Sequence, residues 1–377
     1  MDQLNASLRI AAASFVLAAC MAPAVTPSPS PTGTGSPPTV SAAPSPTVTP
    51  SPTIDPTRYG FVFGGNGRIV VRPERSADAV LAIAGDLPSV SHDGKRIAFW
   101  RMGPQGGNPP QLRIAELPGG AERLVLSIPS GSLGGGIAWA SDDSGLLYEV
   151  HSAEYFPGAG GGPRFTRLES VDLAVAAPQP TTHADLTVSD GRVIVPIAWD
   201  NAGRSASALT TGEGGMSGEY ITWDRAPGVT QNVVRRTRFP WSVVAHSVRA
   251  SHDAKRILAI DVGANELRVW PIADIARADT VAGAGGRVVD ASWRSGVPAD
   301  IAWVVDQTVS VFTYQTGSVR VIHRGQAFVL IEGWRSDGSG LAIHEQGRGP
   351  LLVDIATPQA TALPEAGATL AGGVLLR

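Results

Sequence analysis

A short motif recurs along most of the chain and constrains its fold more than any other feature of the sequence. Each copy has an apolar run, a turn built around Ser-x-Asp-Gly, and a second apolar run. In such a turn the aspartate side chain accepts hydrogen bonds from the backbone, and glycine supplies a positive φ. The clearest copies span residues 90–99, 139–148, 250–259 and 334–343, and weaker ones begin at Ile197 and Ala291. The residues expected to shape the turns are Asp93, Gly94, Asp143, Gly145, Asp253, Asp337 and Gly338.

The spacing of the copies, roughly 40 to 60 residues, is that of a propeller blade. Two more strand-like runs follow each motif, such as residues 112–117 and 123–127 after the first copy. Four antiparallel strands make one blade, and a blade covered on both faces has wholly apolar strands. Composition agrees, because 44 glycines, 30 prolines and only 17% charged residues exclude a coiled coil or a helical solenoid. We therefore expect an all-β β-propeller. A β-sandwich would not explain the period.

The two ends of the repeat region predict a seventh blade. Residues 59–64, 68–72 and 80–84 are three strand-like runs that lack a motif strand, and residues 369–377 are one leftover apolar run. We expect the C-terminal strand to become the first strand of the N-terminal blade, which closes the ring and removes an open sheet edge. A loose C-terminal tail would leave six blades as the alternative.

The motif resembles the TolB-like, WD-like repeats of bacterial extracytoplasmic propellers. The likeness covers nearly all of residues 58–377. The sequence departs from the pattern at Ala254, where glycine is usual, and in the loose copy at Ala291. The resemblance implies an architecture rather than an activity, since such propellers serve many functions.

The N-terminus predicts a lipid anchor. Residues 10–19 form an uncharged apolar run after Arg9, too short to cross a bilayer and typical of a signal peptide. The run ends Leu17-Ala18-Ala19-Cys20, which resembles the lipobox of bacterial lipoproteins. The resemblance implies cleavage before Cys20 and a diacylglycerol on this cysteine. Cys20 is also the chain's single cysteine, so no intrachain disulfide can form.

The following segment predicts a tether. Residues 21–56 contain eleven prolines and thirteen serines or threonines, and Asp55 is their one charge. Such a chain cannot bury enough apolar surface to offset the entropy of ordering it. The expected layout is a signal peptide at 1–19, a lipidated cysteine and disordered tether at 20–57, and a propeller at 58–377. The expected location is extracytoplasmic on the cell membrane, or on the outer membrane of a diderm cell.

Motifs for catalysis and for cofactors are missing from the sequence. It has no Gly-x-Ser-x-Gly pentapeptide, no phosphate loop and no His-Glu-x-x-His. His92 and His252 hold the same place in two turns, so we expect exposed turn residues that lie well apart. Asp142 and Asp143 lack the ligand spacing of a calcium loop and are interpreted as turn formers. The sequence therefore predicts no metal and no cofactor, and it favours a protein that is not an enzyme.

Long loops gather in one sector of the predicted ring. The link between the second and third strands spans residues 102–110, 151–163 and 211–218 in the first three blades and shortens in the others. These links leave by one face, so they form a candidate binding rim. A drifting insertion that folds back is the alternative. The candidate binding residues are Gln105, His151, Glu154, Tyr155, Phe156 and Arg164.

A second candidate is the basic run of Arg235, Arg236 and Arg238 beside Phe239 and Trp241. It suits an anion or polyanionic glycan clamp, but we favour a solvated outer strand whose following aromatic residues enter the core. The formal net charge of −3 gives no general attraction for nucleic acid.

The leading function is a non-catalytic binding or scaffold module that engages a protein or an envelope glycan. One alternative is a lyase or glycoside hydrolase acting at the central channel, where Asp290 and Glu332 are the main acids of the motif strands. Another is a sensory or assembly component, as in TolB-like partners of envelope complexes. Cys20 supplies the contact with the membrane, and a monomer is favoured.

Overall fold

The computed structural model describes residues 59–76, 78–102, 108–154, 163–186, 193–200, 204–210, 217–224, 233–243, 247–281, 285–297, 300–364 and 369–376. Within these ranges the chain forms seven four-stranded antiparallel sheets and one short 3-10 helix, η2 (Ile275–Arg277). The all-β prediction and the count of seven blades are confirmed.

Each sheet is one blade, numbered here from the first complete motif copy. Blade one contains β4 (Asp86–Val90), β5 (Arg96–Arg101), β6 (Gln111–Glu116) and β7 (Glu122–Ser127). Blade two contains β8 (Ser132–Trp139), β9 (Gly145–Ser152), β10 (Thr166–Asp172) and β11 (Thr181–Leu186). Blade three contains β12 (Val193–Trp199), β13 (Arg204–Thr210), β14 (Ser217–Asp224) and β15 (Val233–Arg238). Blade four contains β16 (Arg249–Ala250), β17 (Arg256–Asp261), β18 (Glu266–Pro271) and β19 (Asp279–Thr280). Blade five contains β20 (Val288–Trp293), β21 (Asp300–Val305), β22 (Thr308–Thr313) and β23 (Ser318–Arg324). Blade six contains β24 (Val329–Trp334), β25 (Gly340–Glu345), β26 (Gly349–Asp354) and β27 (Ala360–Ala362). Blade seven joins β28 (Thr369–Leu375) to β1 (Tyr59–Gly65), β2 (Arg68–Pro73) and β3 (Leu81–Ala84).

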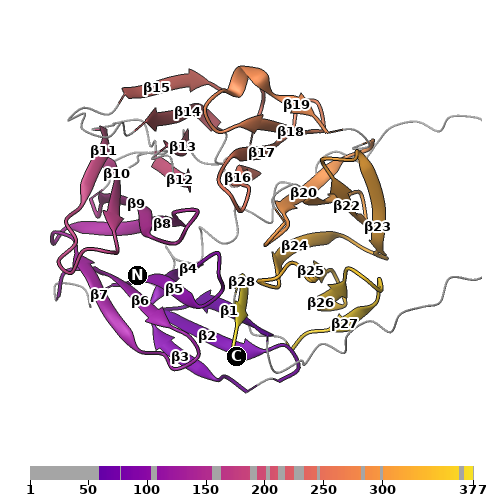
Figure 1. Cartoon of the computed structure of the whole chain (residues 1–377), viewed down its shortest axis with the longest axis horizontal. Helices are drawn as coiled ribbons and strands as arrows, with labels where there is room; N and C mark the ends of the chain where they lie inside the picture. The colour runs from indigo at the N-terminus through magenta and orange to yellow at the C-terminus, as the bar shows by residue number, and fades with distance from the viewer. Residues whose placement is uncertain are drawn as a thin grey trace, which may run out of the picture. The chain divides into compact units, whose positions relative to one another are not determined.

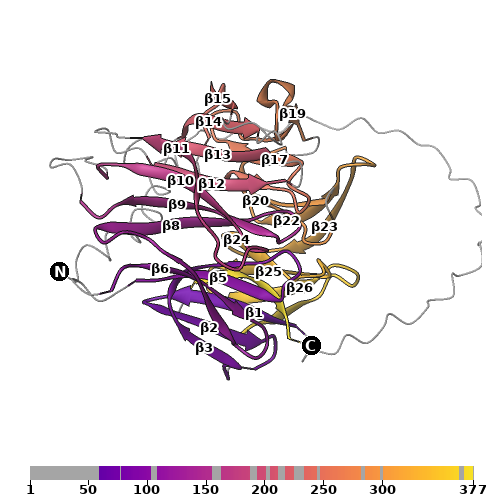
Figure 2. The same ribbon diagram turned by 60° about the vertical axis from the view of Figure 1, so that its left-hand side comes forward.

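The blades follow one another around a ring, and the first strand of each lies nearest the centre (Figure 1). Figure 2 shows the sheets from the side, stacked face to face. Every pair of neighbouring blades shares a cluster of buried apolar side chains. Between blades one and two, for example, the rings of Trp100 and Tyr148 pack edge to face, with centroids 5.8 Å apart. Because both faces of each blade are covered, the strands appear in the sequence as apolar runs.

The ring closes through the two ends of the repeat region. β28 pairs antiparallel with β1, from Tyr59 opposite Leu375 to Gly64 opposite Thr369. A buried ion pair adds to the closure, because Arg335 of blade six binds both carboxylate oxygens of Glu74 in blade seven. The predicted N- and C-terminal closure is confirmed, and it removes the edge that β1 would otherwise expose.

The motif turns hold their shape through the aspartate. Asp93 Oδ1 accepts a hydrogen bond from Ser91 Oγ at 2.6 Å and another from Lys95 N at 3.0 Å, and Asp253 does the same in blade four. Asp337 Oδ1 accepts from the backbone of Ser339. The residue after the aspartate has a positive φ, 70° at both Gly94 and Gly338. A non-glycine residue is strained there, and Ala254 (φ 52°) is the example in blade four.

In blade two the roles shift by one residue from the expectation. The turn aspartate is Asp142, which accepts a hydrogen bond from Ser144 N at 3.0 Å. Asp143 occupies the positive-φ place (φ 58°), so its carboxylate leaves its own turn. Gly145 starts β9, where a Cβ atom would meet the ring of Trp199 at 2.5 Å. Gly145 therefore allows close packing of blade three rather than shaping the turn.

Candidate functional site

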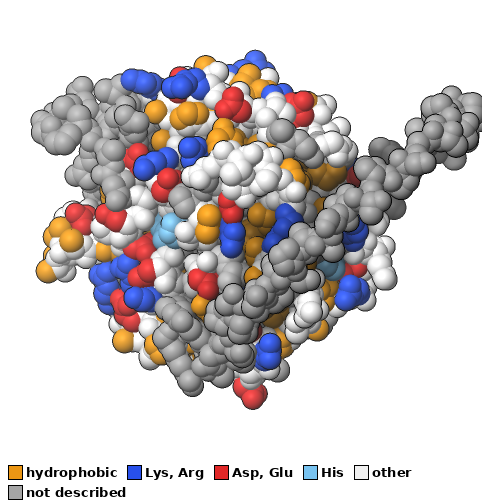
Figure 3. Space-filling view, turned by 45° about the vertical axis from the view of Figure 1, so that its right-hand side comes forward, with side chains coloured by type: hydrophobic (Ala, Val, Ile, Leu, Met, Phe, Trp, Pro, Cys, Tyr) orange, Lys and Arg blue, Asp and Glu red, His pale blue; other side chains and the backbone are white. Residues whose placement is uncertain are grey.

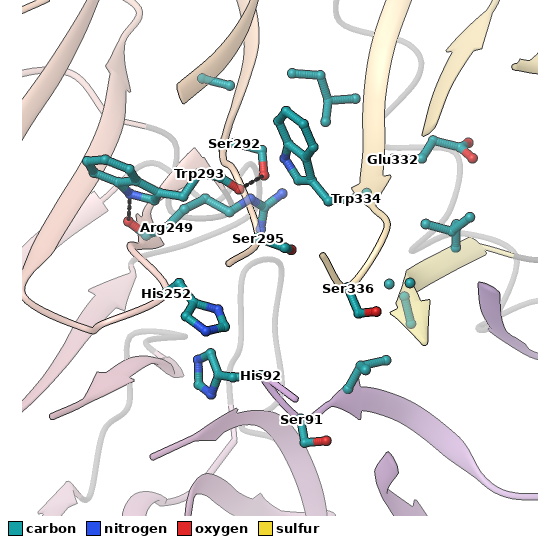
Figure 4. A pocket seen from close by; sticks show the side chains of 18 of the residues that line it. Ser91, His92, Arg249, His252, Ser292, Trp293, Ser295, Glu332, Trp334 and Ser336 are labelled. Carbon is teal, nitrogen blue, oxygen red and sulfur yellow. Dashed lines mark hydrogen bonds between the residues drawn. The ribbon is translucent and has the colours of Figure 1, made fainter. Parts of the chain in front are cut away.

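A cavity of about 340 Å³ lies in the channel at the centre of the ring, and we call it the channel cavity. It is lined by the first strands of blades one, four, five, six and seven and by the motif turns after them. Hydroxyl groups of Ser292, Ser295 and Ser336 line it, as do Arg249 and two tryptophans (Figure 4). The indole N–H of Trp293 donates to the carbonyl oxygen of Arg249 at 3.2 Å, which ties blade five to blade four. The cavity is therefore polar in its side chains and held by rigid inner strands.

Two histidines meet across this channel, contrary to the sequence expectation. The rings of His92 and His252 are perpendicular, with centroids 4.9 Å apart, and they point toward each other in Figure 4. Their turns belong to blades one and four, which are not neighbours in the ring. The expectation that the two residues lie well apart was wrong, because both turns carry their imidazoles inward rather than outward. A second hollow of about 380 Å³, which His92 also lines, faces blades two and three.

Asp143 sets the electrostatics where the rings of His92 and His252 meet. Its Oδ1 lies 2.9 Å from both the backbone N and Nδ1 of His92, and its Oδ2 accepts from Asp93 N at 3.0 Å. Burial opposes ionisation of the Asp143 carboxyl, but these hydrogen bonds outweigh it and hold its pKa below the usual value. Burial and the neighbouring imidazole of His92 lower the pKa of His252, against the opposing effect of Asp143 and Asp253. The surroundings of the two residues thus favour a charged Asp143 carboxylate beside a neutral His252 imidazole.

The two channel acids have different surroundings. Asp290 accepts hydrogen bonds from Ala291 N and from Ile331 N, both at 2.8 Å, so it joins the first strands of blades five and six. Glu332 lies 3.5 Å from Nδ1 of His344. Burial raises the pKa of Glu332, and His344 partly offsets the effect. Asp290 therefore has a structural role in the ring, whereas Glu332 is an acid with a shifted pKa on the cavity wall.

The strand ends that border the predicted rim, such as Arg101 of β5 and Ser152 of β9, lie at the opposite end of the blades from the motif turns. Gln105, Tyr155 and Phe156 lie outside the described residues. Glu154 and Arg164 form an ion pair of 3.2 Å, and Arg164 N donates to the Glu154 carbonyl oxygen at 3.1 Å, so the two contacts link the chain after β9 to the chain before β10. The binding role of the rim stays a prediction.

His151 and the basic run also have definite places. His151 belongs to β9, where its Nδ1 lies 3.4 Å from Glu149 Oε1. The arginines at 235, 236 and 238 are exposed on β15, the outer strand of blade three, and Phe239 is buried behind them. This is the solvated outer strand that the sequence favoured. Acidic and basic side chains alternate over the face drawn in Figure 3, without a large patch of one sign.

Within the described ranges, no group of three or more histidine, cysteine, aspartate or glutamate residues has the geometry to hold a metal ion. The same ranges contain no helix long and apolar enough to span a bilayer.

No protein-family model matches the chain, and no curated protein matches it either. Solved structures do match. An oligogalacturonate lyase in complex with manganese aligns with a TM-score of 0.53 and 13% identity over 79% of this chain and 83% of that one. TolB from Acinetobacter baumannii aligns with a TM-score of 0.42 and 16% identity over 84% of this chain and 66% of that one. A prolyl endopeptidase aligns with a TM-score of 0.53 and 15% identity over 84% of this chain, which spans half of that protein. The likenesses to the lyase and the endopeptidase, both with a TM-score of 0.53, show a shared fold. The chain is a β-propeller.

The sequence pointed to the central channel and its acids Asp290 and Glu332, but not to the meeting of His92 and His252 there, because the lining residues come from strands nearly 300 positions apart. One available signal was the near-identity of Ser91-His92-Asp93 and Ser251-His252-Asp253, which placed the same inward-facing group on two blades.

Proposed function

We propose that this protein is a lipid-anchored, extracytoplasmic binding module whose channel cavity takes a polar segment of an envelope glycan. The observation that supports it is the convergence of hydroxyl, imidazole, guanidinium and indole groups from four blades on one cavity. Small-molecule sites are concave and carry a few well-placed polar groups on a rigid frame. Serine hydroxyls and arginine match the hydroxyl-rich surface of a saccharide.

The anchoring part of the proposal rests on the lipobox at residues 17–20 and the proline-rich tether after it. Two or three acyl chains on Cys20 bind a membrane firmly, where a single chain would be marginal. A proline-rich tether of this length reaches on the order of 100 Å when fully extended, at ~3.1 Å per residue. The propeller can then contact glycan well away from the bilayer surface.

The test fills the cavity from one wall. Ser336 lines the channel cavity and is partly buried, so Ser336→Tyr places a large ring in the space that the ligand needs. Ser318 begins β23 on the outer edge of blade five and is exposed, so Ser318→Tyr is the matched control. The full chain and both variants are incubated with solubilised envelope glycan fragments, and retained sugar is quantified.

We expect the wild type and Ser318→Tyr to retain glycan fragments and Ser336→Tyr to lose at least tenfold of that binding. Equal retention by all three proteins would show that the channel cavity is not the binding site. Circular dichroism and the melting temperature establish that Ser336→Tyr is folded.

A second candidate function is catalysis, favoured by Glu332. A carboxyl group with a raised pKa on a cavity wall is a candidate general acid or base. One solved structure with this fold is an oligogalacturonate lyase. The full chain is therefore incubated with oligogalacturonate. If the full chain cleaves oligogalacturonate and Glu332→Gln does not, the protein is an enzyme and the proposal of a binding module is wrong. If the full chain cleaves nothing, the proposal of a binding module stands.

A further inference from the structure

Two motif turns of the propeller are almost identical in sequence and shape. Blade one has Ser-His-Asp-Gly-Lys-Arg at residues 91–96, and blade four has Ser-His-Asp-Ala-Lys-Arg at residues 251–256. Ser91 N donates to the Arg96 carbonyl oxygen at 2.9 Å, and Ser251 N donates to that of Arg256 at 2.8 Å. The fourth residue has a positive φ in both turns, 70° at Gly94 and 52° at Ala254. The second and third residues therefore present their N–H groups in the same way.

In blade one these N–H groups bind a carboxylate from the next blade. Asp143 of blade two accepts hydrogen bonds from the N–H groups of His92 and Asp93 at 2.9 and 3.0 Å. The guanidinium of Arg96 lies 3.8 Å from the same carboxylate and donates to the Asp143 carbonyl oxygen at 3.1 Å. The Asp143 side chain is 7% exposed, so this anion is nearly removed from solvent.

In blade four the next turn offers no such carboxylate. The turn after β20 runs from Arg294 to Asp300, and its positive-φ residue is Gly296 (φ 67°). The carboxylate of Asp300 is bound by Arg294 at 2.8 Å.

The corresponding donors of blade four have no acceptor in the part of the chain that the structure describes. No described residue accepts a hydrogen bond from the N–H of His252 or Asp253. Arg256 has no carboxylate partner among the described residues, and its guanidinium lies over the ring of Tyr314 at 5.2 Å. Among the described residues, the two turns thus differ by one bound carboxylate, which the blade-one turn has in Asp143 and the blade-four turn lacks.

We propose that the N–H groups of His252 and Asp253 bind the carboxylate of a small hydroxylated acid, in the manner of Asp143 at the blade-one turn. His252 and Ser295, on the two turns concerned, both line the channel cavity, and so do Ser292 and Ser336. The carboxylate binds the turn while the hydroxylated remainder of the ligand extends along these serines. The proposal rests on the proposed binding function and names the charged group of its ligand. A sugar acid has this chemistry.

The first experiment compares acetate with acetamide, which has the same shape and no charge. The full chain is titrated with each at constant ionic strength, and binding is followed by calorimetry and by the melting temperature. A ligand that binds the folded state alone raises its stability by RT ln(1 + [L]/Kd). We expect acetate to bind and acetamide not to bind. Equal behaviour of the two compounds would overturn the proposal.

The second experiment supplies the carboxylate from the chain itself. Ser295 lies on the next turn and lines the channel cavity together with His252, so Ser295→Asp places a carboxylate on the wall of the same cavity. Ser318→Asp is the matched control, because Ser318 is exposed at the start of β23. We expect Ser295→Asp to weaken acetate binding at least tenfold and Ser318→Asp to leave it unchanged. Wild-type acetate affinity in Ser295→Asp would overturn the proposal.

A reciprocal variant keeps the test decisive if Ser295→Asp does not fold. Asp143→Gly removes the carboxylate from the blade-one turn and gives that turn the same free donors as blade four. We expect this variant to lose stability and to recover part of it in acetate, with a larger acetate response than the wild type. An acetate response no larger than that of the wild type would contradict the assigned role of the turn.

The hydroxylated part of the ligand is tested with glucuronate and glucose, which differ only in the carboxylate at C6. We expect glucuronate to bind more tightly than either acetate or glucose. Glucuronate binding no tighter than acetate would overturn the placement of the ligand along the serines. If acetate and glucuronate fail while Ser336→Tyr still abolishes glycan retention, the carboxylate site is wrong and the binding module stands. If glycan retention also fails, both are wrong.

Discussion

Glu74→Gln should destabilise the propeller more than a typical charge removal, because Glu74 and Arg335 form the buried ion pair between blades six and seven. The two side chains are 1% and 8% exposed, and Arg335 Nη2 lies 2.7 Å from Glu74 Oε2. Burial disfavours the charge on Arg335, yet Glu74 outweighs it and raises the pKa of the guanidinium. The substitution keeps the shape of the Glu74 side chain and removes the negative charge that compensates the buried guanidinium of Arg335.

The expected cost follows from what Arg335 retains. Removing one partner of a buried ion pair costs about 3–5 kcal/mol of folding free energy, because the other charge is left uncompensated. Asp354 Oδ2 lies 3.8 Å from Arg335 Nη1 and compensates part of that charge. We therefore expect a loss near the lower end, about 3 kcal/mol. At about 2 °C per kcal/mol for a domain of this size, the melting temperature should fall by about 6 °C.

The control uses an exposed pair in the same chain. Glu154 and Arg164 lie 3.2 Å apart, and their side chains are 71% and 57% exposed. Exposed pairs contribute about 0–1 kcal/mol, so Glu154→Gln should lower the melting temperature by no more than about 2 °C. Both variants are compared by calorimetry and by urea unfolding. Similar small losses for Glu74→Gln and Glu154→Gln would refute the view that the buried pair holds the ring closed.

Four further predictions address the anchor, the closing strand, a strained turn and acid sensitivity. Cys20→Ala should move the protein from the detergent phase to the aqueous phase in a partition assay, and retention in detergent would contradict the lipid anchor. Deleting residues 369–377 removes β28 from blade seven and should lower both solubility and the melting temperature well beyond end fraying. A truncated chain that melts like the full one would contradict the closing role of β28. Ala254→Gly should stabilise the protein by up to about 1 kcal/mol because it relieves a positive φ, while Gly338→Ala should destabilise it, since its Cβ would meet the Ser295 carbonyl oxygen at 2.2 Å. The pKa of His252 is lowered in the folded protein, so the unfolded chain binds more protons below about pH 6.5, and stability should fall on acidification through that range. The urea midpoint at pH 7.5 and 5.5 should therefore shift less in His252→Gln than in the wild type.

The sequence predicted the strands well because the repeat imposes one pattern on all blades. The expected runs at 59–64 and 68–72 became β1 (Tyr59–Gly65) and β2 (Arg68–Pro73). Ring closure was also predictable, since three unpaired strands at one end and one at the other complete a blade. These features depend on local apolar periodicity and on counting, and both are properties of the linear sequence.

The site was harder to predict because it depends on the direction of single side chains. The spacing of the motif copies gives the blade on which His92 and His252 lie, but not whether their rings point into the channel. The same limit applies to Asp143, whose positive φ sends its carboxylate to the neighbouring blade while Asp142 shapes its own turn. A shift of one residue in a turn changes neither the composition nor the repeat period, yet it decides which blade binds the Asp143 carboxylate.

Ring closure and the channel cavity also depend on each other. Residues 370–373 of β28 form part of the cavity wall, and Trp334 and Ser336 flank Arg335, the residue that binds Glu74. The two ends of the propeller, more than 300 residues apart in the sequence, therefore act together at this wall. β28 lines the cavity, and its pairing with β1 holds it there. A substitution that opens the ring removes this wall as well as a structural tie. For this reason a channel ligand should report on closure, and any binding measurement on Ser336→Tyr needs the closure variant Glu74→Gln beside it to separate a blocked cavity from an opened one.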